Sequence, residues 1–398
     1  MMLSSLFRQS VWVRSPAWDL FWMFSGLWLA ALLAVSKPWA PMWAVVTYLL
    51  ATKRFVALYH SWSTVQAVLF SELLREERKR NRARYFYWPL GLVSVSMLLG
   101  VSISQYQWFG EKGQLTSDLW IWALYISIFW VGHFWHFGNQ DFGVLSFYRA
   151  RAGQSGAHDR KIDRAYSAFM MFAIQPVVFL AVLGPKANPF SEIVHTFIPF
   201  AGGAVALLAG PCVALAAAAT AFMIIRELRL ENRSGPRVMY LLVMAFHPAF
   251  LFFSEAQFLY GIVYLWSHWL IATGLVSYMS MNRLEREKRM PAPKAALRHF
   301  ASLGVIVAAV WALSREFSHY HLLDSDGLTV RTTLAAITAE THWIAGFFLG
   351  FFLAEQLVHY YCDRILFRFR EPEIRAKVAP LFARPAGETP AYGERKAA

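Results

Sequence analysis

The chain has 398 residues, 57% of them hydrophobic and only 16% charged, and its formal net charge is +13. The apolar residues lie in runs long enough to cross a bilayer, which takes about 20 residues of helix, so the composition argues against a soluble fold and indicates a polytopic membrane protein. The basic residues cluster at the ends of these runs, which is typical of topology signals and argues against nucleic-acid binding.

Ten apolar segments predict an all-α membrane bundle of about ten transmembrane helices. They cover approximately residues 18–35, 41–70, 86–103, 118–142, 165–183, 200–224, 237–253, 256–280, 299–313 and 341–361. The first 17 residues have neither a continuous apolar core nor a small-residue cleavage site, so no cleaved signal peptide is expected. We expect residues 1–370 to form one transmembrane domain, with its functional site in the cytoplasmic half, and residues 371–398 to form a poorly ordered cytoplasmic tail.

The distribution of Lys and Arg predicts the orientation. The connections after the second, fourth, sixth, eighth and tenth segments are rich in basic residues, and those after the odd-numbered segments are poor in them. Because basic loops stay on the cytoplasmic side, both termini are expected in the cytoplasm. The chain is therefore predicted to be a multi-pass protein of a bacterial inner (cytoplasmic) membrane.

Histidines recur inside these apolar segments, where an unsatisfied polar group costs several kcal/mol. With a rise of 1.5 Å per residue, five of them fall in the cytoplasmic half of four segments, between about 18 and 28 Å from the external ends. These five are His60, His133, His136, His268 and His359. His247 is predicted nearer the midplane, and His342 near the external face is left out. The convergence of five histidines at one level predicts a shared site.

The spacing within two segments supports this interpretation. His133 and His136 are three residues apart and so face the same side of a helix. Glu355, His359 and Asp363 follow one another at steps of four residues, which places two carboxylates and an imidazole on one stripe. The predicted metal ligands are His60, His133, His136, His268, His359, Glu355 and Asp363, with His247 and Asp141 as further candidates.

The chemistry of these groups favours a metal over a proton relay. Imidazole and carboxylate ligands together suit iron, copper or zinc, and facing helices of a bundle commonly assemble such sites. A relay would spread more carboxylates along the bilayer normal. We expect non-haem iron, one or two ions, with copper or zinc as alternatives and haem less favoured. Asn139, Gln140 and Asp141 either support the ligands or form the last helical turn emerging into water.

The string HFGNQDFG, from His136 to Gly143, resembles a His-Phe-Gly-x-x-Asp-Phe string of the Brp/Blh-type membrane β-carotene dioxygenases. The pair His359 and Asp363 is similar to a histidine shortly before an aspartate near the last span of that family, although the spacing differs. The resemblance implies a histidine-ligated non-haem iron centre that uses oxygen on a lipophilic substrate. His136 and His359 would then be iron ligands, and Asp141 and Asp363 supporting or alternative ligands.

The leading hypothesis is thus a membrane oxidoreductase, an oxygenase, desaturase or hydroxylase, acting on a lipophilic or amphipathic small molecule. Its expected partners are this substrate, molecular oxygen, membrane lipid and an electron-donor protein at the cytoplasmic face; no nucleic acid is expected. Tryptophans beside the histidines would wall an apolar pocket. The alternatives are a haem-binding subunit, or a proton-coupled secondary transporter whose helices would break at Pro176, Pro211 and Pro248.

Two further polar features keep two interpretations each. Lys53 and Arg54 interrupt the second apolar segment, where they either cap a break between helices or bind an anionic substrate group. The loop SHYHLLDSDG, with His319, His321, Asp324 and Asp326, either binds a divalent ion or is a solvated loop, and it lacks the spacing of a calcium loop.

Overall fold

The computed structural model describes nine parts of the chain: residues 6–7, 11–36, 55–105, 120–154, 156–183, 201–253, 257–318, 342–369 and 371–382. These residues form helices and connections, and no strand occurs among them. Lys53, Arg54, His319 and His321, for which the sequence suggested roles, lie outside the described residues. The all-helical class predicted from the apolar segments is confirmed for the described parts.

The labelled helices are given below in chain order. Residues 55–65, between α3 and η2, are also helical and carry no label. The labelled helices are α2 (Pro16–Trp22), α3 (Ser25–Ser36), η2 (Gln66–Phe70), η3 (Glu72–Leu74), α5 (Arg75–Arg80), η4 (Ala83–Tyr87), α6 (Trp88–Gln105), α7 (Trp120–Arg151), α8 (Ala157–Phe169), η6 (Met170–Ile174), α9 (Gln175–Leu183), α11 (Ala201–Leu228), α12 (Gly235–Phe253), α13 (Gln257–Glu287), α14 (Ala292–Ser318), α16 (His342–Leu366), α17 (Pro372–Val378) and η7 (Ala379–Phe382).

Five stretches of the described helices are long and apolar enough to cross a membrane. They are Ala83–Ser102, Ala157–Ala181, Leu207–Leu228, Gly235–Phe253 and Ala292–Ala312. The bent pair α2 and α3, with 62° between its halves, could form a sixth. Helices α7, α13 and α16 have 32, 31 and 25 residues, which is sufficient length for a span. The protein therefore has the character of a membrane protein, and the number of ten spans stays a prediction.

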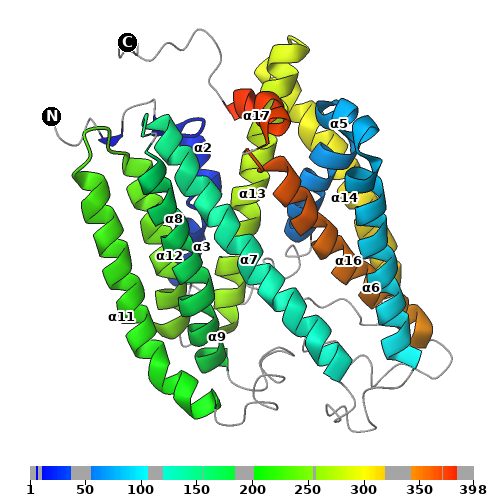
Figure 1. Ribbon diagram of the computed structural model, residues 1–398, viewed down its shortest axis with the longest axis horizontal. Helices are drawn as coiled ribbons and strands as arrows, with labels where there is room; N and C mark the ends of the chain where they lie inside the picture. The colour runs from blue at the N-terminus through cyan, green and yellow to red at the C-terminus, as the bar shows by residue number, and fades with distance from the viewer. Residues whose placement is uncertain are drawn as a thin grey trace.

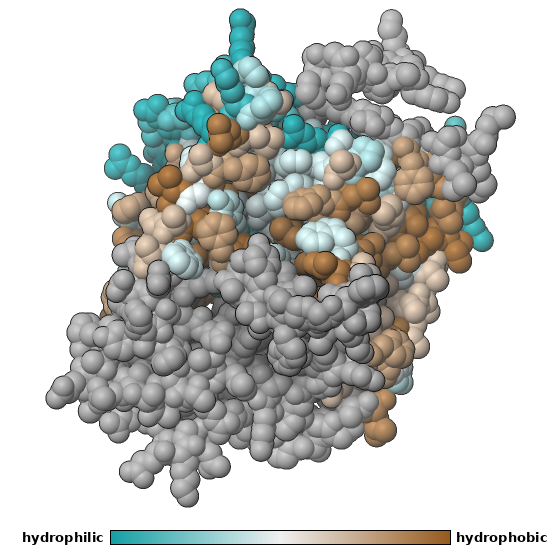
Figure 2. Space-filling view, turned by 180° about the vertical axis from the view of Figure 1, so that it is seen from behind, coloured by the Kyte–Doolittle hydropathy of each residue, from teal (hydrophilic) through white to brown (hydrophobic). Residues whose placement is uncertain are grey.

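The polar and apolar surfaces are separated along the length of the bundle. Figure 2 shows hydrophilic residues gathered at one end of the molecule and hydrophobic residues below them. In Figure 1 the same upper end holds α5, the junctions of α7 with α8, of α11 with α12 and of α13 with α14, and α17. The basic connections predicted to share one side thus lie together at one end of the bundle, as neighbouring helices alternate in direction.

A buried network of charges joins four helices near this end. The Nε of Arg149 in α7 donates to Oδ2 of Asp163 in α8 at 2.8 Å, and Nη2 of Arg237 in α12 donates to Oδ1 of the same carboxylate at 2.5 Å. Arg237 also pairs with Glu227 of α11. None of these four side chains is more than 2% exposed. Since removing one partner from a buried pair leaves an uncompensated charge, the network fixes how these helices meet.

The C-terminal segment differs from its expectation. Residues 371–382, assigned from sequence to a poorly ordered tail, form α17 and η7. Leu381 and Phe382 are buried in the main apolar core, and the carbonyl of Leu381 accepts a hydrogen bond of 2.7 Å from Asn282 of α13. The sequence did not reveal this packing because two apolar residues after a short charged helix carry little periodic signal. Residues 383–398 lie outside the described part of the chain.

Candidate metal centre

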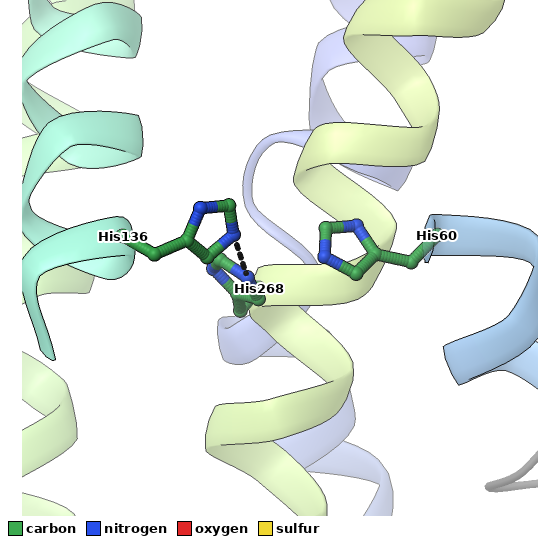
Figure 3. A group of neighbouring side chains, drawn as sticks. All are labelled: His60, His136 and His268. Carbon is green, nitrogen blue, oxygen red and sulfur yellow. Dashed lines mark hydrogen bonds between the residues drawn. The ribbon is translucent and has the colours of Figure 1, made fainter. Parts of the chain in front are cut away.

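Four histidine side chains from four helices meet inside the bundle. His60 comes from helical residues 55–65, His136 from α7, His268 from α13 and His359 from α16. Ring centroids lie 4.2 Å apart for His60 and His359, 4.8 Å for His60 and His268, and 4.9 Å from His136 to both His268 and His359. All four side chains are buried. Figure 3 shows the rings of His60, His136 and His268 turned toward one another.

A carboxylate completes the cluster. Oδ2 of Asp363 lies 3.6 Å from Nε2 of His136 and 3.7 Å from Nε2 of His359. Asp363 is one turn beyond His359 on α16 and is itself buried. Of the three residues in the stripe predicted on this helix, His359 and Asp363 lie in the cluster and approach His136 of α7, whereas Glu355 belongs to neither ligand group.

The cluster contains two overlapping groups whose atoms are placed as metal ligands require. One group is His60, His136 and His268, and the other is His136, His359 and Asp363; within each, the potential ligand atoms lie no more than 4.8 Å apart. An ion about 2.1 Å from each nitrogen holds neighbouring ligand atoms about 3 to 4 Å apart, so only small ring movements would close either group. His136 belongs to both groups.

Ring nitrogens of two histidines in the cluster have no hydrogen-bond partner among the described residues. Nδ1 of His60 and Nε2 of His359 are among them. One direct bond links two of the imidazoles, between Nε2 of His136 and Nε2 of His268 at 3.1 Å. A buried polar atom without a partner is costly in an apolar interior, and a metal ion would satisfy these nitrogens. The donor set, the burial and the orphaned nitrogens all fit a bound ion.

Aromatic and amide side chains set the orientation of two ligands. The ring of Phe137 stacks on His268 with centroids 3.4 Å apart, and Nε2 of Gln140 donates to the carbonyl of His268 at 3.0 Å. The ring of Tyr360 stacks on His136 at 4.4 Å and 23°. Gln140 therefore contacts the helix that carries His268. Of the three polar residues after His136, this one supports a candidate ligand.

Comparison of the chain with protein-family models, with curated proteins and with solved structures found no match in any of the three. The resemblance of residues 136–143 to the Brp/Blh-type enzymes therefore stays an expectation. The chemistry of the centre has to follow from its own residues.

His133 does not join either group, although it shares a helix face with His136. Its Nδ1 lies 2.7 Å from the hydroxyl of Tyr360, and its ring packs on Phe137 with centroids 4.0 Å apart. It is therefore placed beside the cluster and bonded to a residue that stacks on a candidate ligand. Sequence reasoning missed Tyr360, and its position directly after His359 was the available signal.

Three other candidates are also outside both groups. Asp141 accepts a hydrogen bond of 2.6 Å from the hydroxyl of Tyr240, so it joins α7 to α12. His247 packs edge-on against Tyr264 at 5.0 Å. Glu355 is buried one turn before His359 on α16 but is not part of either ligand group. Asn139 donates to the carbonyl of Trp135 and is a local helix contact.

Proposed function

We propose that this protein is a membrane-embedded metalloenzyme, a non-haem iron oxygenase, desaturase or hydroxylase that acts on a lipophilic or amphipathic small molecule. One observation carries the proposal: four buried imidazoles from four separate helices converge with the carboxylate of Asp363. Each of the two overlapping groups would hold one ion. Because Nε2 of His136 can bind only one ion at a time, a second ion would have to rely on the remaining ligands of the other group. Imidazole and carboxylate together suit iron, with copper and zinc as alternatives.

The surroundings of the cluster favour a metal over simple helix packing. A packing histidine needs two hydrogen-bond partners, whereas Nδ1 of His60 and Nε2 of His359 have none among the described residues. Four imidazoles with so few bonds between them leave nitrogen lone pairs that can be donated to a cation. The side chains of Phe137 and Tyr360 pack on His268 and His136, and Tyr264 packs on Phe137, so aromatic rings surround this side of the cluster.

Bound iron would supply the activation of oxygen, which side chains alone do not provide. The chain would contribute position and an apolar environment. Phe137 and Tyr360 fix the ring planes of His268 and His136. The hydroxyl of Tyr360, bonded to His133, lies beside the cluster and could hold a polar group of the substrate. The location within the apolar bundle favours a substrate that enters from the bilayer.

The geometry argues against a haem between these histidines. A haem iron takes two axial imidazoles on opposite faces of a flat macrocycle. Here the Nε2 atoms of His136 and His268 lie 3.1 Å apart, and the centroids of His60 and His359 are 4.2 Å apart, which leaves no space for a porphyrin between either pair.

Metal content tests the proposal directly. The chain is purified in detergent without oxygen, supplied with ferrous ion, passed over a desalting column and measured by plasma mass spectrometry. We expect one to two ions per chain, and loss of most of this metal in His136→Ala because His136 belongs to both groups. His247→Ala is the matched control, since it removes another buried histidine that lies outside the groups.

A spectroscopic measurement then addresses reactivity. Nitric oxide added to the ferrous protein should give the S = 3/2 paramagnetic signal of an iron with a free position, as an oxygen-using site requires. A folded wild-type chain with negligible iron, copper, zinc and manganese would refute the metal centre. Bound metal without a nitric oxide signal would keep the metal centre and refute the oxygenase.

A further inference from the structure

A second polar site lies away from the histidine cluster, at the end of the bundle with the basic connections. It is a pocket of about 190 Å³ between η2, the last turns of α13 and the first turns of α14. Its volume exceeds what a single water molecule needs. Residues Met279 to Leu284 of α13 and Arg298 to Ile306 of α14 supply most of its wall, with η2 opposite and Leu381 at one edge.

The polar side of the pocket is basic and contains no carboxylate among its lining residues. Arg283, Arg298 and His299 line it together with Gln66, Ser71 and Ser302. Nε2 of Gln66 donates to Oγ of Ser302 at 3.2 Å, which ties η2 to α14 across the pocket. His299 is buried and its Nε2 lies 3.0 Å from Oγ of Ser277. The hydroxyls of Ser71 and Ser302 donate to the carbonyls of Ala67 and His299, so the donors left for a ligand are the two guanidinium groups and the second N–H of Gln66. Guanidinium and amide donors are the usual partners of an oxyanion.

The guanidinium groups of Arg283 and Arg298 have donors available for a ligand. Arg298 is exposed, and no ion pair or hydrogen bond of its side chain occurs within the described parts of the chain. Arg283 pairs with Glu287 at 3.1 Å, but the carboxylate of Glu287 is half exposed. Because this carboxylate is solvated, the pair contributes modestly, and a ligand that contacts both guanidinium groups can replace it.

The other side of the pocket is apolar and continues along α14. Phe70, Leu284 and Ile306 line the pocket, and Phe70 is largely exposed. Ile306 is two turns beyond Arg298 on α14, about 12 Å along the axis toward the middle of the bundle. Val305, next to it, is 71% exposed. A ligand with an anionic head at the arginines and a chain along this stripe would match both halves of the site.

From these observations we infer that the pocket between η2, α13 and α14 binds an anionic phosphate group, held by Arg283 and Arg298 beside Ser302. The phosphate can belong to the headgroup of an anionic lipid or to free phosphate. The apolar stripe from Phe70 to Ile306 favours the lipid. This site is independent of the metal centre and does not rest on the proposed enzymatic activity.

General attraction of basic loops to anionic membranes has to be separated from this pocket, since it draws lipid to any exposed Lys or Arg. Lys294 provides the matched control. It is an exposed cation one helical turn before Arg298 on α14, and it does not line the pocket. Lys294→Gln and Arg298→Gln therefore each remove one positive charge from α14, but only Arg298→Gln changes a residue that lines the pocket.

Native mass spectrometry of the whole detergent-solubilised chain, titrated with phosphatidylglycerol or phosphatidylcholine of the same acyl composition, measures the inference. We expect a first phosphatidylglycerol to bind more tightly than phosphatidylcholine. Arg298→Gln should weaken it about fivefold to tenfold, which is the effect of one cation at a lipid headgroup. Lys294→Gln should leave it within twofold. Ser302→Leu, which fills the pocket without changing charge, should weaken it as Arg298→Gln does.

The source of the phosphate follows from a competition arm. Inorganic phosphate is added against chloride at equal ionic strength; displacement of the lipid that disappears in Arg298→Gln identifies free phosphate as a ligand, and retention of the lipid identifies the headgroup. Three results would contradict phosphate binding in this pocket. They are equal losses of lipid binding in Lys294→Gln and Arg298→Gln, normal lipid binding in Ser302→Leu, and no selective binding of either probe to the wild-type chain.

Discussion

His133 and His136 lie three residues apart on α7, and their side chains have different neighbours. Nε2 of His136 lies 3.1 Å from Nε2 of His268 and belongs to both ligand groups. Nδ1 of His133 lies 2.7 Å from the hydroxyl of Tyr360, whose ring stacks on His136. Two histidines that share one helix face can therefore differ in role, because the neighbouring helix α16 presents a carboxylate to one and a phenol to the other.

Replacement of His133 by Leu tests this difference. We expect His133→Leu to keep its metal within about twofold of the wild-type content, and to lose about 1 kcal/mol of stability with the Tyr360 hydrogen bond. Metal per chain and the midpoint of thermal unfolding in detergent measure both effects. A folded His133→Leu chain that had lost its metal as His136→Ala is expected to do would show that His133 is a ligand.

At the scale of the elements, the close approach of α16 to α6 positions two ligands. A Cβ added at Gly350 of α16 would meet the carbonyl oxygen of Ser96 and would lie 2.6 Å from Cα of Met97. The backbones can pack this closely only because Gly350 has no side chain, a use of small residues that is common where membrane helices cross. The same helix carries His359 about two and a half turns further on and Asp363 about three and a half turns further on.

Gly350→Ala should therefore push α16 away from α6 and destabilise the chain by about 1 to 3 kcal/mol. Gly143→Ala on α7 is the control, because a Cβ there has nothing within 4 Å and alanine favours helix. The midpoint of thermal unfolding should fall for Gly350→Ala and stay or rise for Gly143→Ala. An unchanged midpoint for Gly350→Ala would contradict the close packing of these helices.

Prolines inside helices bear on the transporter alternative. The transporter alternative would place breaks at Pro176, Pro211 and Pro248, but Pro211 and Pro248 lie inside α11 and α12, which continue past them. A sharp bend occurs instead between α2 and α3, at 62°. The inverted repeats of transporters call for breaks at matching places in two halves, and the described helices do not supply them at these prolines.

At the scale of the whole molecule, the basic connections lie at one end of the bundle (Figure 1). This arrangement joins residues that are hundreds of positions apart, since Lys377 of α17 lies 3.2 Å from Glu77 of α5 and Arg84 pairs with Glu371. The same end holds the phosphate pocket and the buried charge network. A membrane protein with this distribution is expected to keep that end in the cytoplasm.

Cysteine accessibility tests the orientation. Lys79→Cys, Glu231→Cys and Lys288→Cys introduce thiols at exposed positions of three connections. A membrane-impermeant maleimide should label none of them in intact cells and all three in inverted membrane vesicles. The wild-type chain, with Cys212 partly buried and Cys362 buried, gives the background. Labelling of any one of the three from the outside would overturn the shared orientation.

The amino-acid sequence determined the helical class, the membrane character and the residue types of the centre. The length of an apolar run and the presence of a histidine within it are properties of the local sequence, so they indicate a membrane helix with a polar site before the tertiary structure is known. Helical rise placed His60, His136, His268 and His359 at one level, and the structure brings these four together. It also shows Asp363 among them, as the spacing on its helix predicted.

Only the tertiary structure decided which candidates meet. Periodicity gives the height and the face of a side chain on its own helix but not the neighbour that this face contacts. His133 was therefore indistinguishable in sequence from the histidines that meet, and His247 and Asp141 could only be named as further candidates. All three bond to or pack on tyrosines instead. The ordered segment 371–382 and the phosphate pocket depend in the same way on contacts between distant residues, which arise only when the helices pack.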